Sequence, residues 1–133
     1  MSVDRRVTRR IMDKAGMNVY FETYSTDFNR AIDTYYTDDI DFEYPGGKYQ
    51  GKEAVRAYFD RLHQKFNEIL KPISVLIDGD KVAAEVEAEL QALIDFPDFG
   101  GKPFNKGESQ FTVYGIFYDL REDKICRVKI YRP

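Results

Sequence analysis

The clearest pattern of apolar and polar residues lies in the stretch 40–66. Its first part alternates: Ile40, Phe42 and Tyr44 are separated by acidic residues, which is the period of a half-buried β-strand. A Pro-Gly-Gly turn at 45–47 ends this strand. Beyond the turn, apolar residues recur at helical spacing on one side of an amphipathic helix that begins after Gly51, namely Val55, Phe59, Leu62 and Phe66.

The chain before this stretch shows helical periodicity. Ser2 or Asp4 is a candidate cap for a first helix, which we expect to end or kink at Gly16. A second helical segment, 19–24, is expected to follow a cap at Asn18. The third segment begins after a Ser-Thr-Asp cap and carries apolar residues at helical spacing: Phe28, Ala31, Ile32 and Tyr35.

The chain after the central helix alternates with the period of strands. We expect strands at 73–78, with Pro72 near the start, and at 81–95, 109–120 and 124–131. The composition of 81–95 also favours a helix, but strict alternation directly after an Asp-Gly turn favours a strand. Residues 96–107, rich in Gly, Pro and Phe, are expected to form a long loop that acts as a flexible apolar lid.

This order of elements predicts an α+β fold in a single domain, 1–133. The hairpin strands are expected to be about 11–15 residues long, against a usual length of about 5–6. Strands of that length curve, and a curved sheet has a concave face that helices cover incompletely. The sequence therefore predicts a cone in which a mainly antiparallel sheet wraps around about three N-terminal helices, with a cavity between them.

The amino-acid composition limits the classes of ligand and partner that we expect. The chain has ten Tyr, ten Phe and no Trp, so any cavity is expected to be aromatic and to take a small apolar ligand. A net charge of −3 gives no footprint for nucleic acid, and a basic N-terminus is interpreted as a solvated helix face. A single cysteine excludes an internal disulfide, and no apolar run approaches the ~20 residues of a membrane span. We expect a cytoplasmic protein without a cofactor.

Three segments resemble one superfamily: TYYTDDIDFEYPGG at 34–47, GKEAVRAYF at 51–59 and FYDLREDKICRVKIYRP at 117–133. In this order and spacing they are similar to the nuclear-transport-factor-2-like (NTF2-like) proteins, and among them to SnoaL-like polyketide cyclases and ketosteroid isomerases. The resemblance implies the cone fold and a homodimer formed through the outer sheet face. It does not single out one activity, because this superfamily includes isomerases, dehydratases, cyclases, epoxide hydrolases and non-catalytic binders.

The resemblance also implies positions for a site. The oxyanion-holding tyrosine of ketosteroid isomerases matches Tyr20, their second donor falls near Tyr114, and their base aspartate is replaced by Tyr44. Dehydratases of the scytalone type suggest a pocket that uses Tyr24 or Tyr20, with Tyr44 and His63. The site would therefore keep hydroxyl donors and lose the usual carboxylate base.

The candidate chemistry follows from these residue types. Tyrosine hydroxyls at Tyr20, Tyr44 and Tyr114 can donate to a developing enolate, and His63, the only histidine, can act as general base. Asp95 is a second candidate base, unless it is a strand-end carboxylate in water. We expect no metal, since no histidine accompanies the acidic row of the long strand. The residues expected to contact a ligand are Tyr24, Phe59, Phe96, Phe99 and Phe104.

Two functions remain open at this point. One is cofactor-free acid–base catalysis on an apolar carbonyl compound, as an isomerase, dehydratase or cyclase. The other is a non-catalytic ligand-binding or dimerising domain. The discriminating observation is whether His63 or any carboxylate reaches the cavity close to a tyrosine hydroxyl.

Overall fold

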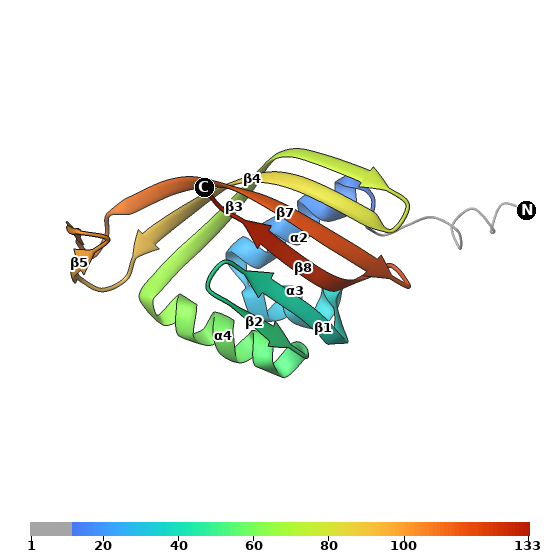
Figure 1. Cartoon of the computed structure of the whole chain (residues 1–133), viewed down its shortest axis with the longest axis horizontal. Helices are drawn as coiled ribbons and strands as arrows, with labels where there is room; N and C mark the ends of the chain where they lie inside the picture. Colours follow the sequence, from blue (N-terminus) through green and yellow to red (C-terminus); the bar gives the residue numbers. More distant parts are fainter. Residues whose placement is uncertain (1–11) are drawn as a thin grey trace, which may run out of the picture.

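Long strands bend over three helices in the protein, whose structure is a computed structural model describing residues 12–133 (Figure 1). The described helices are α2 (Lys14–Thr26), α3 (Phe28–Tyr35) and α4 (Lys52–Lys65). They lie on the concave face of a six-stranded sheet, and this confirms the predicted α+β cone. Most of the predicted first helix, including its candidate caps Ser2 and Asp4, lies outside the described residues.

Helix α2 contains the predicted second segment, 19–24, but begins earlier, at Lys14. Asp13 caps it: its carboxylate accepts a hydrogen bond from the Gly16 N–H at 2.8 Å. The predictions that Gly16 ends a helix and that Asn18 caps one were therefore wrong, because the cap already holds the amide of Gly16 inside the first turn. Asp27 ends α2 and caps α3 by accepting from the Arg30 N–H, as the sequence predicted.

The sheet has the order β2-β1-β8-β7-β4-β3. Neighbouring strands are antiparallel except for the parallel pair β1–β8. The predicted strands are confirmed in kind, although several are longer, and β2 was not predicted. Their bounds are β1 Tyr36–Tyr44, β2 Gly47–Gln50, β3 Phe66–Asp78, β4 Lys81–Ala92, β7 Ser109–Arg121 and β8 Lys124–Tyr131.

Strand β3 begins at Phe66, seven residues before the predicted start, and contains Pro72. The proline is tolerated because β3 is an edge strand and has a bulge at this point: Pro72 pairs with Val86, Ser74 pairs with Glu85, and Ile73 is left over. The extra residue changes which side chains point inward. Before the bulge these are Phe66, Glu68 and Leu70, and after it Val75 and Ile77.

The predicted loop 96–107 forms a short hairpin instead, with strands β5 (Phe96–Phe99) and β6 (Lys102–Phe104). It projects at the left end of Figure 1. Strand β4 ends at Ala92, before the predicted end at Asp95, because the chain turns there. The Ala92 carbonyl accepts from the Gly107 N–H, and the Ala92 N–H donates to the Glu108 carbonyl.

The core lies between α2, α3 and the inner face of β1, β4, β7 and β8. Fully buried side chains there include Phe21, Ile32, Ile40, Val86 and Ile125. Burying such side chains stabilises a fold by about 1.5–3 kcal/mol each, before conformational entropy is subtracted. None of the described helices has the length and apolarity needed to cross a membrane.

Candidate functional site

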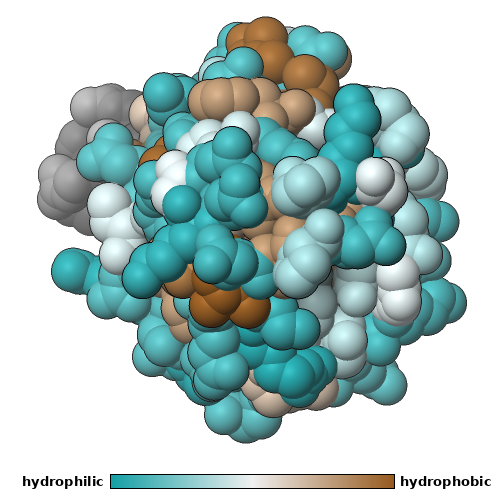
Figure 2. All heavy atoms as spheres, turned by 90° about the vertical axis from the view of Figure 1, so that its left-hand side faces the viewer, coloured by the Kyte–Doolittle hydropathy of each residue, from teal (hydrophilic) through white to brown (hydrophobic). Residues whose placement is uncertain are grey.

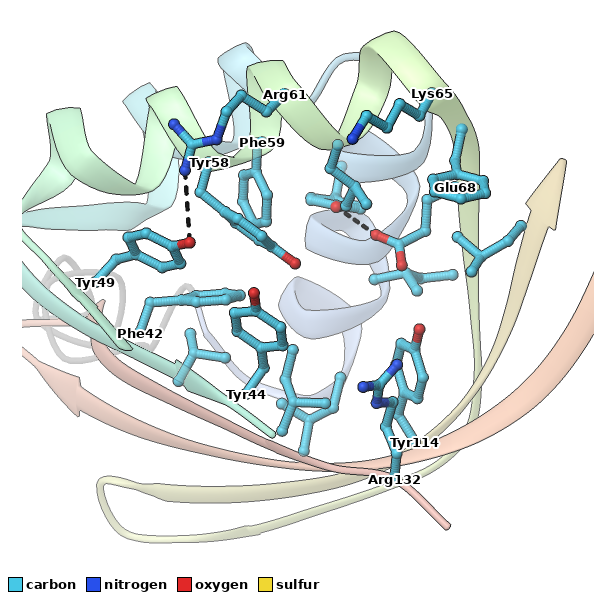
Figure 3. Close-up of a pocket in the computed structure, with 18 of the residues that line it drawn as sticks. Phe42, Tyr44, Tyr49, Tyr58, Phe59, Arg61, Lys65, Glu68, Tyr114 and Arg132 are labelled. Carbon is cyan, nitrogen blue, oxygen red and sulfur yellow. Dashed lines mark hydrogen bonds between the residues drawn. The ribbon is translucent and has the colours of Figure 1, made fainter. Parts of the chain in front are cut away.

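A cavity of about 420 Å³ opens between α4 and the concave face of the sheet (Figure 3). Seen from the hairpin end of the molecule, apolar atoms lie recessed between hydrophilic residues (Figure 2). The wall of the cavity includes residues of helices α2 and α4 and of strands β1, β3, β7 and β8. The aromatic wall residues are Tyr20, Tyr24, Tyr36, Phe42, Tyr44, Tyr49, Tyr58, Phe59, Phe66, Phe99, Tyr114 and Tyr118.

The deep end of the cavity holds a cluster of buried phenols. The hydroxyls of Tyr20 and Tyr36 lie 2.7 Å apart, and the ring of Tyr118 meets that of Tyr20 edge to face. Burial raises the pKa of all three hydroxyls well above the ordinary value, so they stay protonated. The Tyr20 hydroxyl, a predicted donor, therefore lies in the cavity wall but already has a partner.

One side of the cavity is a stack of three tyrosines from three elements. Tyr58 of α4 packs against Tyr44 of β1 and Tyr49 of β2, with ring centroids 5.0 and 4.8 Å away, and those two rings lie 6.3 Å from each other. The Pro-Gly-Gly turn allows this arrangement, because a Cβ at Gly46 would lie only 2.4 Å from Cε2 of Tyr44. The hydroxyls of Tyr44 and Tyr58 point toward the middle of the cavity in Figure 3.

The opposite side carries Glu68, the one buried charged side chain among the described residues, with 7% of its surface exposed. The Tyr24 hydroxyl donates to its Oε1 at 2.5 Å. Burial raises the pKa of Glu68, while the hydroxyls of Tyr24 and Tyr114 and the charge of Arg132 partly offset the rise. Burial and the nearby Glu68 in turn raise the pKa of Tyr114 to about 12.

His63 lies behind this pair rather than in the wall of the cavity. Its ring stacks on Phe28 with centroids 4.3 Å apart, and its Nε2 lies 3.2 Å from the Tyr24 hydroxyl. Burial lowers the pKa of His63 and so favours the neutral ring, and the charge of Asp60 opposes this with a smaller effect. Tyr24 therefore connects His63 to Glu68, and both Tyr24 and Glu68 line the cavity whereas His63 does not.

Of the other predicted site residues, Phe59 and Phe99 line the cavity and Phe96, Phe104 and Asp95 do not. Phe99 lines the cavity, whereas Phe96 and Phe104 pack with Phe66 in the aromatic cluster of the β5–β6 hairpin. Phe59 of α4 is buried in the wall against Tyr24, with centroids 5.2 Å apart. Asp95 is exposed at the base of the hairpin and accepts a hydrogen bond from the Lys106 N–H, away from the cavity wall.

A carboxylate, several phenols and a mainly apolar wall suit proton transfer on a bound organic molecule. A buried carboxyl whose pKa is raised is a stronger base when ionised and a usable acid when protonated. Neighbouring hydroxyls can donate to an oxygen that becomes negative during the reaction. Among residues 12–133 no three His, Cys, Asp or Glu side chains come close enough together to hold a metal ion.

Comparison with known sequences shows which protein family the chain belongs to. The sequence profile of the SnoaL-like domain matches residues 18–128, which is most of the chain. The protein belongs to the SnoaL-like family. No functionally curated protein matches this SnoaL-like chain.

Solved structures agree with the SnoaL-like assignment in their fold. A candidate polyketide cyclase from Xanthomonas campestris pv. campestris superposes with a TM-score of 0.74 at 22% identity, covering 88% of this chain and 87% of its own. A second one, from Pseudomonas putida, gives 0.73 at 23% identity, covering 88% of each chain. An LEH-like epoxide hydrolase from M. tuberculosis gives 0.69 at 13% identity, covering 88% of this chain and 79% of its own. The superpositions show that the chain has the NTF2-like fold, and sequence identities this low do not show which activity it has.

The sequence analysis missed the carboxylate of this SnoaL-like pocket. It considered acidic residues on β4, but Glu85, Glu87 and Glu89 point to the outer face. The available signal for Glu68 was its place between Phe66 and Leu70, which alternate inward on the same strand. That signal was overlooked because the strand was expected to begin only after Pro72.

Proposed function

We propose that this SnoaL-like protein is a cofactor-free acid–base enzyme acting on a small, largely apolar carbonyl compound. Isomerisation, dehydration and cyclisation all belong to this class, because each begins with proton transfer next to a carbonyl. The observation that carries the proposal is the Glu68 carboxylate in the cavity wall, 2.5 Å from the Tyr24 hydroxyl. Structural neighbours named as a polyketide cyclase and an epoxide hydrolase support a small-molecule substrate.

The cavity wall suits an apolar ligand. Its volume of about 420 Å³ falls within the range of about 300–1,000 Å³ that is usual for small-molecule sites. Phe42 and Phe59 provide apolar rings, and the stacked Tyr44 and Tyr58 offer a flat face. Phe99 lies at the mouth and closes over the ligand, while Phe96 and Phe104 support it from the hairpin.

Glu68 is proposed as the base in place of the expected His63. Its carboxylate takes a proton from the carbon next to the carbonyl, and a new O–H bond forms on Glu68. The electron pair of the broken C–H bond forms a carbon–carbon double bond, and the carbonyl oxygen becomes negative. Protonated Glu68 then returns the proton to another carbon or to a leaving hydroxyl.

The negative oxygen needs hydrogen-bond donors. Tyr114 is proposed as the first donor because its hydroxyl points toward the cavity near Glu68 in Figure 3. Tyr44 is proposed as a second donor from the opposite wall. Removing one preorganised donor costs about 10²–10³ in rate in other enzymes. Tyr20 is proposed to support the deep wall, since its hydroxyl is paired with Tyr36.

Hydrogen exchange into a simple ketone tests the proposal without knowledge of the natural substrate. The protein is incubated in heavy water with dibenzoylmethane or tetralone, and deuterium uptake next to the carbonyl is followed by NMR. We expect uptake above the buffer rate, and a loss of about 10²-fold or more of that excess in Glu68→Gln. His63→Ala is the comparison: a full loss there with Glu68→Gln unchanged would assign the base to His63.

The same experiment separates the enzyme from a non-catalytic binder. If the ketones bind, as judged by NMR shifts, while exchange stays at the buffer rate, the protein is a binding domain. Mass spectrometry of small molecules that purify with the native protein would then identify the bound class. Uptake at the buffer rate in the wild type would thus contradict the acid–base proposal directly.

We also propose that the protein forms a homodimer through the outer sheet face. Phe111, Val113 and Phe117 form an exposed row on β7. On the outer face this row lies between Glu85, Glu87 and Glu89 of β4 and Arg127 and Lys129 of β8. A two-fold axis along β7 places the acidic row of one copy over the basic row of the other. Phe117→Glu should convert the dimer to a monomer in sedimentation experiments, and a monomeric wild type would overturn this.

A further inference from the structure

The charges around the cavity are unbalanced. Arg61 and Lys65 of α4 and Arg132 after β8 all line it, whereas Glu68 is the one carboxylate among the lining residues. The whole chain has a net charge of −3, so this local excess of positive charge runs against the overall balance. A local field of that sign attracts anionic ligands to the opening.

None of these three cations forms a close ion pair with a carboxylate of residues 12–133, although the charge of Arg132 acts on Glu68. The ion pairs among residues 12–133 involve other basic residues, such as Arg56 with Asp33 and Lys81 with Asp119. Arg61 has a protein partner of another kind: its guanidinium lies 5.9 Å from the centre of the Tyr49 ring and 3.5 Å from the Tyr49 hydroxyl. Lys65 and Arg132 are the other two cations that line the cavity, and the charge of Arg132 already acts on Tyr114 and Glu68.

Lys65 and Arg132 line the same cavity from opposite walls, with Glu68 between them in Figure 3. In Figure 3 the Lys65 side chain runs along the end of α4, and its amino group lies on the helical side of the hydrogen bond to Glu68. The Arg132 guanidinium extends from the sheet side, next to Tyr114. Its charge lowers the pKa of both Tyr114 and Glu68, against the larger raising effect of burial. An anion between the two cations would lie beside the proposed catalytic carboxylate.

We propose that the ligand is an apolar, ring-containing acid whose anionic group binds between Lys65 and Arg132 while its ring system fills the tyrosine-lined cavity. This inference rests on the proposed function for the location of the site and adds the chemical class of the substrate. A carboxylate or an acidic enol would serve equally, because guanidinium and ammonium groups bind both through charge-assisted hydrogen bonds. Both cations are exposed at the opening, so binding costs little of their hydration.

A pair of matched probes tests the proposal. Naphthoate and naphthamide have the same ring and nearly the same shape, and only naphthoate carries a charge at neutral pH. We expect naphthoate to bind about tenfold or more tightly, measured by NMR titration at low salt. In the double variant Lys65→Gln/Arg132→Gln we expect the two dissociation constants to become about equal. The preference of the wild type should also shrink at high salt, because the site is open to solvent.

The matched control removes two exposed positive charges elsewhere. Lys14→Gln/Arg30→Gln changes the net charge equally but alters α2 and α3 outside the cavity, and it should keep the naphthoate preference. Equal binding of the two probes by the wild type would overturn the proposal, as would the absence of any binding. A preference that survives in the Lys65/Arg132 variant would overturn it as well.

Failure of this inference differs from failure of the proposed function. Glu68→Gln is expected to strengthen the naphthoate preference, since the amide removes a negative charge beside the anion and leaves Lys65 and Arg132 in place. If ketone exchange depends on Glu68 but naphthoate is not preferred, the acid–base role stands and the anion site does not. If naphthoate is preferred but no exchange occurs, the cavity binds organic acids without turnover.

Discussion

The hydroxyl of Tyr24 donates to Oε1 of Glu68 across 2.5 Å, and both side chains are almost fully buried. The hydrogen bond joins α2 to the edge strand β3, so one contact links the helical layer to the sheet at the cavity wall. A buried carboxyl without such a partner would cost the fold considerably more. The contact also adjusts the acidity of the proposed base, because it lowers the pKa that burial raises.

Glu68→Gln should change the pH dependence of stability. Burial raises the folded-state pKa of Glu68 above its ordinary value of 4.5, so its contribution is fully present below that pH and is lost as pH rises through the folded pKa. Glutamine does not titrate. The unfolding free energy of the variant relative to wild type should therefore rise from acid to neutral pH, measured by urea unfolding. A constant difference between about pH 4 and pH 8 would contradict the raised pKa.

Tyr24→Phe should destabilise the fold and raise the pKa of Glu68 further. The substitution removes the hydroxyl that donates to the carboxylate, and losing one partner of a buried charged group costs about 1–3 kcal/mol. The carboxyl ¹³C shift of Glu68, followed against pH by NMR, reports the pKa. Tyr35→Phe is the matched control, because no hydrogen bond of its hydroxyl is described for residues 12–133. An unchanged Glu68 titration would show that Tyr24 does not control it.

The Tyr20–Tyr36 hydroxyl pair should behave as one unit. Each single change to Phe leaves a buried hydroxyl without its partner and should cost about 1–3 kcal/mol of unfolding free energy. The double change removes both groups together and should cost less than the sum of the two single changes. A urea-unfolding cycle on the four proteins measures this coupling. Additive costs would mean that the hydroxyls act independently.

Gly46→Ala should move Tyr44 while leaving the fold in place. The new methyl group would lie 2.4 Å from Cε2 of Tyr44, so the ring must turn away and leave its stack with Tyr58. We expect weaker ligand binding, a change in the near-ultraviolet circular dichroism of tyrosine, and less than about 1.5 kcal/mol of lost stability. Gly47→Ala is the control, since its nearest ring atom lies 3.7 Å away. Equal spectra for both variants would contradict this role of Gly46.

The regular parts of the fold could be predicted because one periodicity dominated each of them. Alternation at 40–44 and at 109–120 required strands, and the Asp-Gly turn after Asp78 fixed the hairpin between β3 and β4. The elements that were missed depend on contacts between distant residues. β2 is short and pairs only with β1, and the β5–β6 hairpin is held by aromatic contacts with Phe66.

The sequence predicted that Tyr20, Tyr44 and Tyr114 line the cavity, but it did not predict the buried carboxylate there. Tyr20, Tyr44 and Tyr114 lie on elements whose period was clear, so their inward direction followed from the pattern. Glu68 lies in a strand segment before a proline, where local rules argue against a strand. Its burial depends on the bulge after Pro72, which nothing in the local sequence specifies.

The bulge in β3 separates two tasks along one strand. Val75 and Ile77 pack into the main core, whereas residues 66–70 form a wall of the cavity. The unpaired Ile73 shifts the register between these two parts of the strand. A substitution among residues 66–70 should therefore disturb the pairing of β3 with β4 beyond the bulge less. Position 68 is thus a natural point of entry for directed evolution, where histidine, cysteine or lysine could introduce a different reactivity into the same framework.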